Sequence, residues 1–279
     1  MTEPLLSTNR LIKRFGGLLA TDSVSIDVRP GEIHALIGPN GAGKTTLVSQ
    51  LTGNLKPDSG TIHFAGRDVT HLPTHARVRM GLARSFQITS VLREFSALDN
   101  VALAVQAHAG HSFRFLADAR RDATLRRPAR QGLAEVGLGA RADTAASALS
   151  HGEQRQLEIA MALAGDPRLL LLDEPMAGMG AEESQRMIGF LRGFKGRRAM
   201  LLIEHDMDAV FQLADRITVL VYGRAIASGT PEEIRANPDV RQAYLGDDLP
   251  ASPLIGGRWP ESALFTAPVP EGEGDAKNS

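Results

Sequence analysis

The chain of 279 residues contains no cysteine, one tryptophan and two tyrosines. The absence of cysteine excludes disulfide bonds, zinc sites built from thiolates and cysteine nucleophiles. No apolar run approaches the roughly 18 residues that a membrane-spanning helix requires, and the first ten residues lack the basic flank of a signal peptide. The chain also lacks a strong net charge, since it contains 31 Lys and Arg residues and 32 Asp and Glu residues. The charge balance therefore gives no overall attraction to nucleic acid or to acidic membranes.

Three short apolar runs organise the chain, namely Ile33–Ile37, Arg168–Glu174 and Ala199–His205. Each is too short for a helix and fits a strand of a parallel sheet that is covered on both faces. Helical patterns lie between them, over Lys44–Leu55, Gln154–Ala164 and Glu182–Phe194. This alternation predicts an α/β core, and the carboxyl ends of its strands are expected to line one crevice.

The regions around this core have different patterns. Residues 11–64 contain alternating short runs that suit antiparallel strands, and residues from about 88 to 165 are predicted to be mostly helical. Residues 216–229 predict two strands joined by a turn at Tyr222 and Gly223, followed by a short helix that Thr230 caps. Beyond Leu249, repeated Pro, Gly, Ser and acidic residues predict a loose tail over 249–279.

A phosphate-binding loop follows the first apolar run. The motif G-x-x-x-x-G-K-[ST] is matched in full by Gly38, Pro39, Asn40, Gly41, Ala42, Gly43, Lys44 and Thr45. The glycines allow backbone N–H groups to point at a phosphate, Lys44 reaches the β- and γ-phosphates, and the Thr45 hydroxyl binds Mg²⁺. Asn40 and Thr46 are either further phosphate contacts or ordinary loop and helix residues.

A second helix start has the features of a phosphate site. Ser150 and Glu153 have the spacing of a capping box, and Gly152 lets a ligand approach the backbone closely. The free N–H groups at a helix start bind anions. The chain therefore carries two candidate phosphate sites, which lie about 110 residues apart in the sequence.

Acidic residues and a histidine end the other two runs. Asp173 can bind Mg²⁺ through water, and Glu174 can polarise an attacking water. Acidic residues also commonly end strands, and a lone histidine is more often structural than functional. The phosphate-binding loop and the shared crevice favour the functional interpretation of Asp173, Glu174 and His205.

The order of these motifs resembles that of the ATP-binding cassette (ABC) ATPases, from about residue 5 to residue 248. The resemblance implies a P-loop core with a parallel sheet, an N-terminal antiparallel β subdomain and an inserted helical subdomain. It implies that Phe15 stacks on adenine and that Gln87 senses Mg²⁺ and the γ-phosphate while it touches a membrane partner. It also implies a signature motif with Ser150 and Gly152, a Mg²⁺ ligand at Asp173, a catalytic Glu174 and a switch histidine at His205.

The same resemblance accounts for two phosphate sites and suggests partners. Two cassettes, homologous or identical, would close head to tail, so that the signature helix of one holds the ATP on the P-loop of the other. Stretches such as "FGGLLA", "GLARSFQ" and "NPDVRQAYLG" resemble cassettes of bacterial importers for branched-chain amino acids. Such importers add two membrane permeases and a periplasmic binding protein, which places the cassette on the cytoplasmic face of the inner membrane.

Other functions share parts of this pattern. Urea and short-chain amide importers and lipopolysaccharide-exporting cassettes have much of it. A soluble ABC ATPase outside transport, or a non-ABC P-loop kinase or GTPase, is a further alternative. The last class would lack both the signature and a histidine like His205.

Three features depart from the family pattern or fall outside it. His151 replaces the usual glycine of the signature, and Glu153 replaces the usual glutamine. Because an acidic side chain that faced a phosphate would repel it, Glu153 is interpreted as the capping partner of Ser150. Gly180 stands where the family typically has an Asp or Asn that couples the two ATP sites. The arginine-rich stretch 113–131 fits either contact with lipid or a permease, or a solvated helix face, and the solvated face is favoured.

Overall fold

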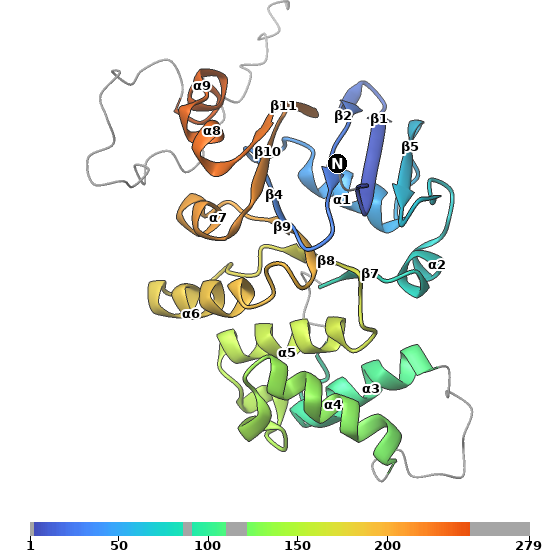
Figure 1. Cartoon of the computed structure of the whole chain (residues 1–279), viewed down its shortest axis with the longest axis vertical. Helices are drawn as coiled ribbons and strands as arrows, with labels where there is room; N and C mark the ends of the chain where they lie inside the picture. Colours follow the sequence, from blue (N-terminus) through green and yellow to red (C-terminus); the bar gives the residue numbers. More distant parts are fainter. Residues whose placement is uncertain (1–2, 86–90, 110–121, 246–279) are drawn as a thin grey trace, which may run out of the picture.

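The computed structural model describes residues 3–85, 91–109 and 122–245, which form two sheets and a separate layer of helices (Figure 1). Gln87, Arg114, Arg120, Arg121 and the predicted tail lie outside the described residues. No helix in the described ranges is long and apolar enough to cross a membrane.

The N-terminal sheet is antiparallel, as the sequence predicts, with strand order β2-β1-β5-β6 and with β3 paired to β1. Its strands are β1 (Leu6–Phe15), β2 (Leu18–Val24), β3 (Asp27–Val28), β5 (Ser59–Phe64) and β6 (Arg67–Asp68). The central sheet has the order β11-β10-β4-β9-β8-β7, and all its pairs are parallel except β10 with β11. Its strands are β4 (Ile33–Ile37), β7 (Leu82–Arg84), β8 (Leu169–Asp173), β9 (Ala199–Ile203), β10 (Arg216–Val221) and β11 (Arg224–Gly229).

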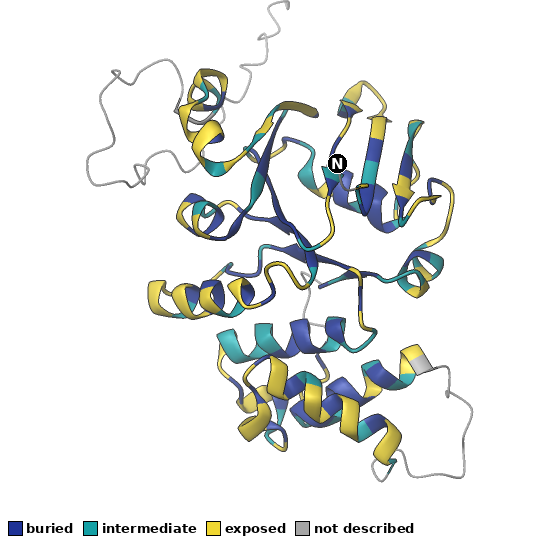
Figure 2. Ribbon diagram, in the orientation of Figure 1, coloured by how far each residue is buried: buried dark blue, intermediate teal, exposed yellow. Residues whose placement is uncertain are grey.

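The three apolar runs form β4, β8 and β9, and every residue of these strands is buried. Two of them are shorter than expected, because Glu174 leaves the strand with φ at +47° and because β9 ends before Glu204. Alternate residues of β8 face different clusters: Leu170 and Leu172 pack toward the helical layer, and Leu169 and Leu171 pack toward the N-terminal sheet. Covering on both faces explains why these runs are continuously apolar (Figure 2).

Helices cover both faces of the central sheet. They are α1 (Lys44–Thr52), α2 (Thr74–Arg79), α3 (Ala97–Ala109), α4 (Ala123–Glu135), α5 (His151–Leu163), α6 (Ala181–Arg192), α7 (Met207–Leu213), α8 (Pro231–Ala236) and α9 (Pro238–Leu245). Helix α1 ends at Thr52, earlier than expected, because Gly53 adopts a left-handed cap with φ at +82°. The expected capping box of Thr230 with Glu233 is present at the start of α8.

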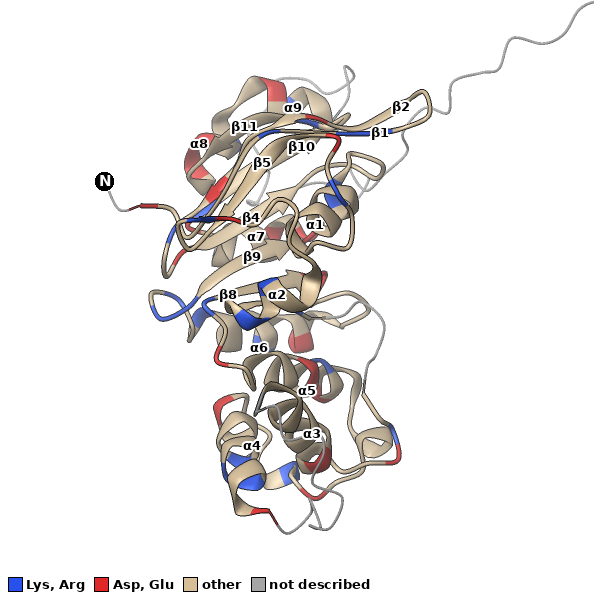
Figure 3. Ribbon diagram, turned by 90° about the vertical axis from the view of Figure 1, so that its right-hand side faces the viewer, with Lys and Arg blue, Asp and Glu red and all other residues tan. Residues whose placement is uncertain are grey.

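The region predicted to be mostly helical contains α3, α4 and α5, which pack on one another below the central sheet. Two short 3₁₀ segments, Gly139–Arg141 and Ala146–Ala148, join α4 to α5. Within the arginine-rich stretch, Arg126 pairs with Asp99 at 2.8 Å, whereas Arg127 and Arg130 are exposed on α4. Basic and acidic residues are both scattered over the elements that Figure 3 shows, without a patch of one sign that spans them.

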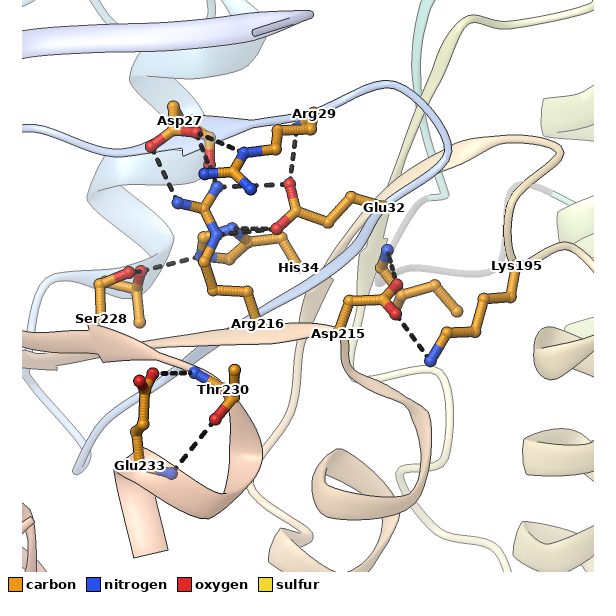
Figure 4. Close-up of polar contacts among 12 residues, drawn as sticks. Asp27, Arg29, Glu32, His34, Lys195, Asp215, Arg216, Ser228, Thr230 and Glu233 are labelled. Carbon is orange, nitrogen blue, oxygen red and sulfur yellow. Dashed lines mark hydrogen bonds and ion pairs between the residues drawn. The ribbon is translucent and has the colours of Figure 1, made fainter. Parts of the chain in front are cut away.

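A partly buried polar network links the amino ends of β4 and β10 to Asp27 of β3 and to Glu32, which precedes β4 (Figure 4). Arg216 at the start of β10 donates hydrogen bonds to Asp27 and Glu32, and His34 on β4 shares a 2.8 Å hydrogen bond with Thr218. These groups lie at the amino ends of β4 and β10, because Arg216 is the first residue of β10 and pairs with His34. The network therefore lies at the opposite end of β4 from the phosphate-binding loop, which follows the carboxyl end of that strand.

Candidate active site

The phosphate-binding loop joins β4 to α1, as the motif predicts. Gly43 is the residue before α1 and has φ at +98°, and a Cβ there would collide with the carbonyl of Ala20 on β2. Lys44 Nζ donates hydrogen bonds to the carbonyls of Gly38, at 2.5 Å, and Pro39, at 3.0 Å. Burial lowers the pKa of Lys44, and the carboxylates of Glu174 and Asp173 act in the opposite direction. The loop thus holds its ammonium group against two of its own carbonyls, in the electrostatic field of two carboxylates.

Two other elements support this loop. The N–H of Gly223, in the turn between β10 and β11, donates to the carbonyl of Ala42 at 2.9 Å, and the N–H of Asp22 donates to the carbonyl of Gly223 at 2.8 Å. The hairpin of β1 and β2 carries Phe15 at its end, where the side chain is half exposed and Lys13 Nζ lies 5.7 Å from the ring centre. An exposed aromatic ring on a hairpin that contacts the loop can stack on a base.

Carboxylates from β8 lie at the same edge of the sheet. Asp173, the last residue of β8, is buried and accepts a 2.6 Å hydrogen bond from Arg84 Nη2. Glu174 Oε1 lies 3.7 Å from Nδ1 of His205, which follows β9. About a third of the Glu174 side chain remains exposed, so water can reach it. The strand ends that the sequence placed in one crevice do meet.

Glu204 has a role that the sequence pattern did not assign. Its buried carboxylate accepts hydrogen bonds from the N–H groups of Met176, at 2.9 Å, and His205, at 3.2 Å. Burial raises its pKa. Glu204 therefore fixes the loop after Glu174 relative to His205, and the signal available in the sequence was an acidic residue directly after a buried strand. Arg84, the partner of Asp173, was missed as well.

The oxygen atoms near the loop suit a hard cation. Asp173 offers a carboxylate and Thr45, in the first turn of α1, offers an exposed hydroxyl. In the described ranges no group of three or more His, Cys, Asp or Glu residues could hold a metal by itself. Mg²⁺ typically binds in this way, with one or two protein oxygens, several waters and phosphate oxygens of the substrate. Asp173 and Thr45 therefore fit a magnesium ion that binds together with a nucleotide. Thr46 is the next residue of α1, and Asn40 lies in the loop itself.

The second candidate phosphate site lies at the start of α5, in the helical layer rather than among the strand ends. The predicted capping box is confirmed: Ser150 Oγ accepts from the N–H of Glu153 at 3.2 Å, and Glu153 Oε2 accepts from the N–H of Ser150 at 2.8 Å. Glu153 Oε1 also lies 3.2 Å from Arg141, so its charge is engaged. A Cβ on Gly152 would contact the carboxylate of Glu183 at 3.5 Å.

The two departures from the family pattern lie near this helix start. The ring of His151 lies beside Gly178, since a Cβ at Gly178 would be 3.5 Å from it. Gly180 precedes α6 and provides no side-chain cap for it. The unusual residues of the signature and of the loop after Glu174 therefore belong to one neighbourhood.

Comparison with known proteins agrees with this geometry. The family model described as "ABC transporter" matches residues 21–177, and one described as "Branched-chain amino acid ATP-binding cassette transporter" matches residues 226–249. The chain belongs to the ABC transporter family. It is an ATP-binding cassette, the subunit that hydrolyses ATP to power transport. Non-ABC kinases and GTPases are thereby excluded.

Several ABC relatives match along almost their whole length. The high-affinity branched-chain amino acid transport ATP-binding protein LivG of Escherichia coli K12 is 41% identical over 256 residues, covering 88% of this chain and all of LivG. BraF of Pseudomonas aeruginosa is 39% identical over the same lengths. The lipopolysaccharide export ATP-binding protein LptB of Acidithiobacillus ferridurans is 39% identical over 88% of this chain and 98% of its own.

Solved ABC structures have the same fold. The ADP conformation of the cassette MJ1267 aligns with a TM-score of 0.77 at 28% identity, covering 88% of this chain and all of the other. A nucleotide-free ATP-binding cassette from an ABC transporter aligns with a TM-score of 0.77 at 30% identity and the same coverage.

Proposed function

We propose that the chain is the ATP-hydrolysing subunit of a bacterial importer for branched-chain amino acids. The observation that carries the proposal is the meeting of Lys44, Asp173, Glu174 and His205 at one edge of the sheet, in a chain 41% identical to LivG along LivG's whole length. The additional match to the branched-chain amino acid cassette model at residues 226–249 supports the substrate class.

The residues of the site have separate tasks in this proposal. Backbone N–H groups of the loop and Lys44 bind the β- and γ-phosphates of ATP. Asp173 and Thr45 hold Mg²⁺, which supplies positive charge against the transferring phosphate. Glu174 accepts a hydrogen bond from the attacking water and withdraws its proton, while His205 orients Glu174 and the water from the adjacent strand end. Gln87 serves as a further contact to Mg²⁺ and the γ-phosphate, and Phe15 stacks on adenine.

Ser150 and Gly152 act on the nucleotide of a second cassette. Their helix start belongs to the helical layer, whereas the P-loop of the same chain lies on the sheet. Two cassettes, identical or homologous, would close head to tail over two ATP molecules, which carry enough negative charge to engage both sets of donors.

The other proposed partners are two membrane permeases and, indirectly, a periplasmic binding protein. The cassette would then lie at the cytoplasmic face of the inner membrane, held there by the permeases. Substrate choice would reside in those subunits, so the cassette supplies only the conformational work.

The experiment is uptake in the native bacterium. Deletion of the gene is expected to abolish uptake of radiolabelled leucine, isoleucine and valine, and the wild-type chain, but not a Lys44→Ala variant, is expected to restore it. Affinity purification of the full chain from membranes is expected to recover two permeases. Normal uptake after deletion would refute the substrate assignment, and loss of urea uptake or of lipopolysaccharide export, which LptB serves in its own organism, would establish the alternative.

A further inference from the structure

The turn between β10 and β11 carries a residue that its backbone geometry disfavours. Val221 pairs with Arg224, so the turn consists of Tyr222, with φ at +46°, and Gly223, with φ at +78°. A hairpin turn with positive φ at both positions prefers Asn, Asp or Gly at the first of them, because a bulky side chain is strained there. Tyr222 gains no burial in exchange, since 83% of it is exposed. Packing within the described part of the chain therefore does not explain a tyrosine at this position.

This turn lies directly against both the phosphate-binding loop and the β1–β2 hairpin. On the side of the loop, the N–H of Gly223 donates to the carbonyl of Ala42 at 2.9 Å. On the side of the hairpin, a Cβ at Gly223 would lie 3.0 Å from the carbonyl oxygen of Ala20 and 3.2 Å from that of Leu19. Tyr222 is therefore held at the place where the loop and the hairpin meet.

The β1–β2 hairpin exposes two further apolar side chains at its tip. Phe15 and Leu18 pair across the tip, and they are 50% and 66% exposed. Strands β2 and β11 lie side by side (Figure 1), and Arg224 Nε donates to Asp22 Oδ2 at 2.5 Å between them. Three exposed apolar side chains, including Tyr222, thus come from two touching hairpins beside one phosphate-binding loop. A local excess of exposed apolar surface is typical of a binding site.

The position of these residues indicates which part of a ligand they bind. A nucleotide whose phosphates are held by the loop has a ribose and a base that extend beyond it. A single aromatic ring covers only one face of a base, so the rest of the nucleoside stays in water unless a second side chain covers it. Aromatic rings suit this task, because every base has a flat face on which they can stack. A tyrosine brings apolar surface without charge, which suits the nucleoside and not the phosphates.

We propose that Tyr222 is a second nucleoside-binding residue: its ring packs against the adenosine part of the nucleotide whose phosphates the loop holds and whose base stacks on Phe15. The proposal rests on the proposed function, because that function places the base against Phe15. Tyr222 then contributes to the affinity for the nucleoside and leaves the affinity for the phosphates unchanged. Its unfavourable backbone conformation is retained because the turn presents the ring to the ligand.

The first test compares a ligand that has a nucleoside with one that lacks it. Isothermal titration calorimetry on the full-length chain measures binding of ADP and of pyrophosphate, neither of which requires turnover. Tyr222→Ala is expected to weaken ADP binding about tenfold and to leave pyrophosphate binding unchanged, whereas Tyr222→Phe retains both. The matched control Ile226→Ala removes an exposed apolar side chain from the same hairpin and is expected to change neither. Unchanged ADP binding by Tyr222→Ala, or equal losses for both ligands, would overturn the proposal.

The second test separates binding from stability. Tyr222→Asn places a residue that tolerates positive φ at the first position of the turn. Relief of the backbone strain is expected to raise the melting temperature of the unliganded chain by about 2–4 °C. The same variant is expected to lose ADP affinity about tenfold, because the ring is absent. A Tyr222→Asn variant that binds ADP as tightly as the wild type would show that the ring does not contact the nucleoside.

The wild type and Phe15→Ala separate this inference from the proposed function. If the wild-type chain does not bind ADP, or if Phe15→Ala binds ADP as tightly as the wild type, the base does not lie where the proposed function places it, and both proposals fail. If Phe15→Ala weakens ADP binding and Tyr222→Ala does not, only the inference about Tyr222 is wrong.

Discussion

Glu174 adopts a left-handed backbone conformation, with φ at +47°, directly after a fully buried strand. Residues other than glycine rarely adopt it, and such strain costs on the order of 1 kcal/mol or more. The surrounding structure holds it in place, since Glu204 binds the N–H of Met176 two residues later. This backbone conformation turns the chain sharply out of β8, so that Glu174 faces His205 instead of continuing the strand.

Glu174→Gln retains the shape and the hydrogen bonding of this side chain but removes its ability to take a proton. We expect ATP binding to be unchanged and turnover in the assembled complex to fall about 10²- to 10⁴-fold. Steady-state ATPase assays, alongside binding of a fluorescent ATP analogue, check this. Turnover close to that of the wild type would remove Glu174 from the role of base.

Ser150 separates a structural from a functional reading of the signature. Ser150→Arg is expected to leave ATP affinity of the lone chain nearly intact, but to block hydrolysis in the complex at the opposite site, because the bulky side chain obstructs closure over the γ-phosphate. Loss of the cap costs roughly 0.5–2 kcal/mol of stability. Thermal unfolding, ATP affinity and complex ATPase should be measured on one preparation. A less stable variant that is fully active below its melting temperature would show that Ser150 only caps its helix.

At the scale of elements, one buried arginine holds α1 and α2 together. Arg77 of α2 is 1% exposed and its guanidinium group donates to the carbonyls of Gln50, Leu51, Leu72 and Thr70 at 2.6 to 3.1 Å. Gln50 and Leu51 belong to the last turn of α1, where carbonyl groups lack the donors of a helix interior; the carbonyl of Gln50 also accepts from the N–H of the capping Gly53 at 3.2 Å. Burial lowers the pKa of Arg77 to about 10. The helix that begins at the phosphate-binding loop thus ends on a cation from its neighbour.

Arg77→Lys retains the charge but cannot reach carbonyls in several directions at once. We expect the free energy of unfolding to fall by about 3 kcal/mol, since several buried carbonyls lose their donors. Urea unfolding monitored by circular dichroism checks this, with the exposed Arg79→Lys of the same helix as the control. Equal midpoints for the two variants would contradict the role of Arg77.

The contrast between Arg77 and the phosphate-binding loop shows what a sequence can predict. Some features depend only on neighbours within a few residues, and their patterns can be recognised in the sequence. They are the phosphate-binding loop, the capping boxes of Ser150 and Thr230, and the buried strands. The partners of Arg84 and Arg216 lie 89 and up to 189 residues away along the chain. Nothing local to Arg84 indicates Asp173, because only the order of the strands in the sheet brings them together. The end of α1 was predicted too late along the chain for a different reason. Gly53 stops the helix locally, whereas the apolar pattern continues past it.

For the whole molecule, the buried network around His34 sets a response to acid. His34 on β4 is fully buried, and burial lowers its pKa from 6.5 to about 4. Arg216 opposes its protonation as well, while Glu32, 3.7 Å from Nδ1, and Asp27 favour it. Because the unfolded chain takes up the proton more readily, the stability that His34 contributes at pH 7 is lost as the pH falls from 6.5 toward 4.

We expect protonation linked to His34 to lower the free energy of unfolding by about 2 kcal/mol between pH 7 and pH 5. Burial raises the pKa of Glu158 and of Glu204, and their protonation offsets part of this loss, so a variant is needed to isolate His34. His34→Gln retains a partner for Thr218 and does not titrate. Urea unfolding from pH 7 to pH 5 should show a steeper loss for the wild type than for this variant; parallel curves would exclude His34 as the source.

The order of strands in the central sheet has a consequence for synthesis on the ribosome. The strand before the phosphate-binding loop, β4, is flanked by β9 and β10, and the loop itself receives a hydrogen bond from Gly223. All of these partners emerge long after residues 38–45 have been translated. A nascent chain therefore carries the complete motif before the strands and the turn that hold it in shape have been made. The nucleotide consequently cannot assist the folding of the N-terminal half of the chain. Capture of ATP is expected to mark the completion of the domain, once the turn at Gly223 has left the exit tunnel.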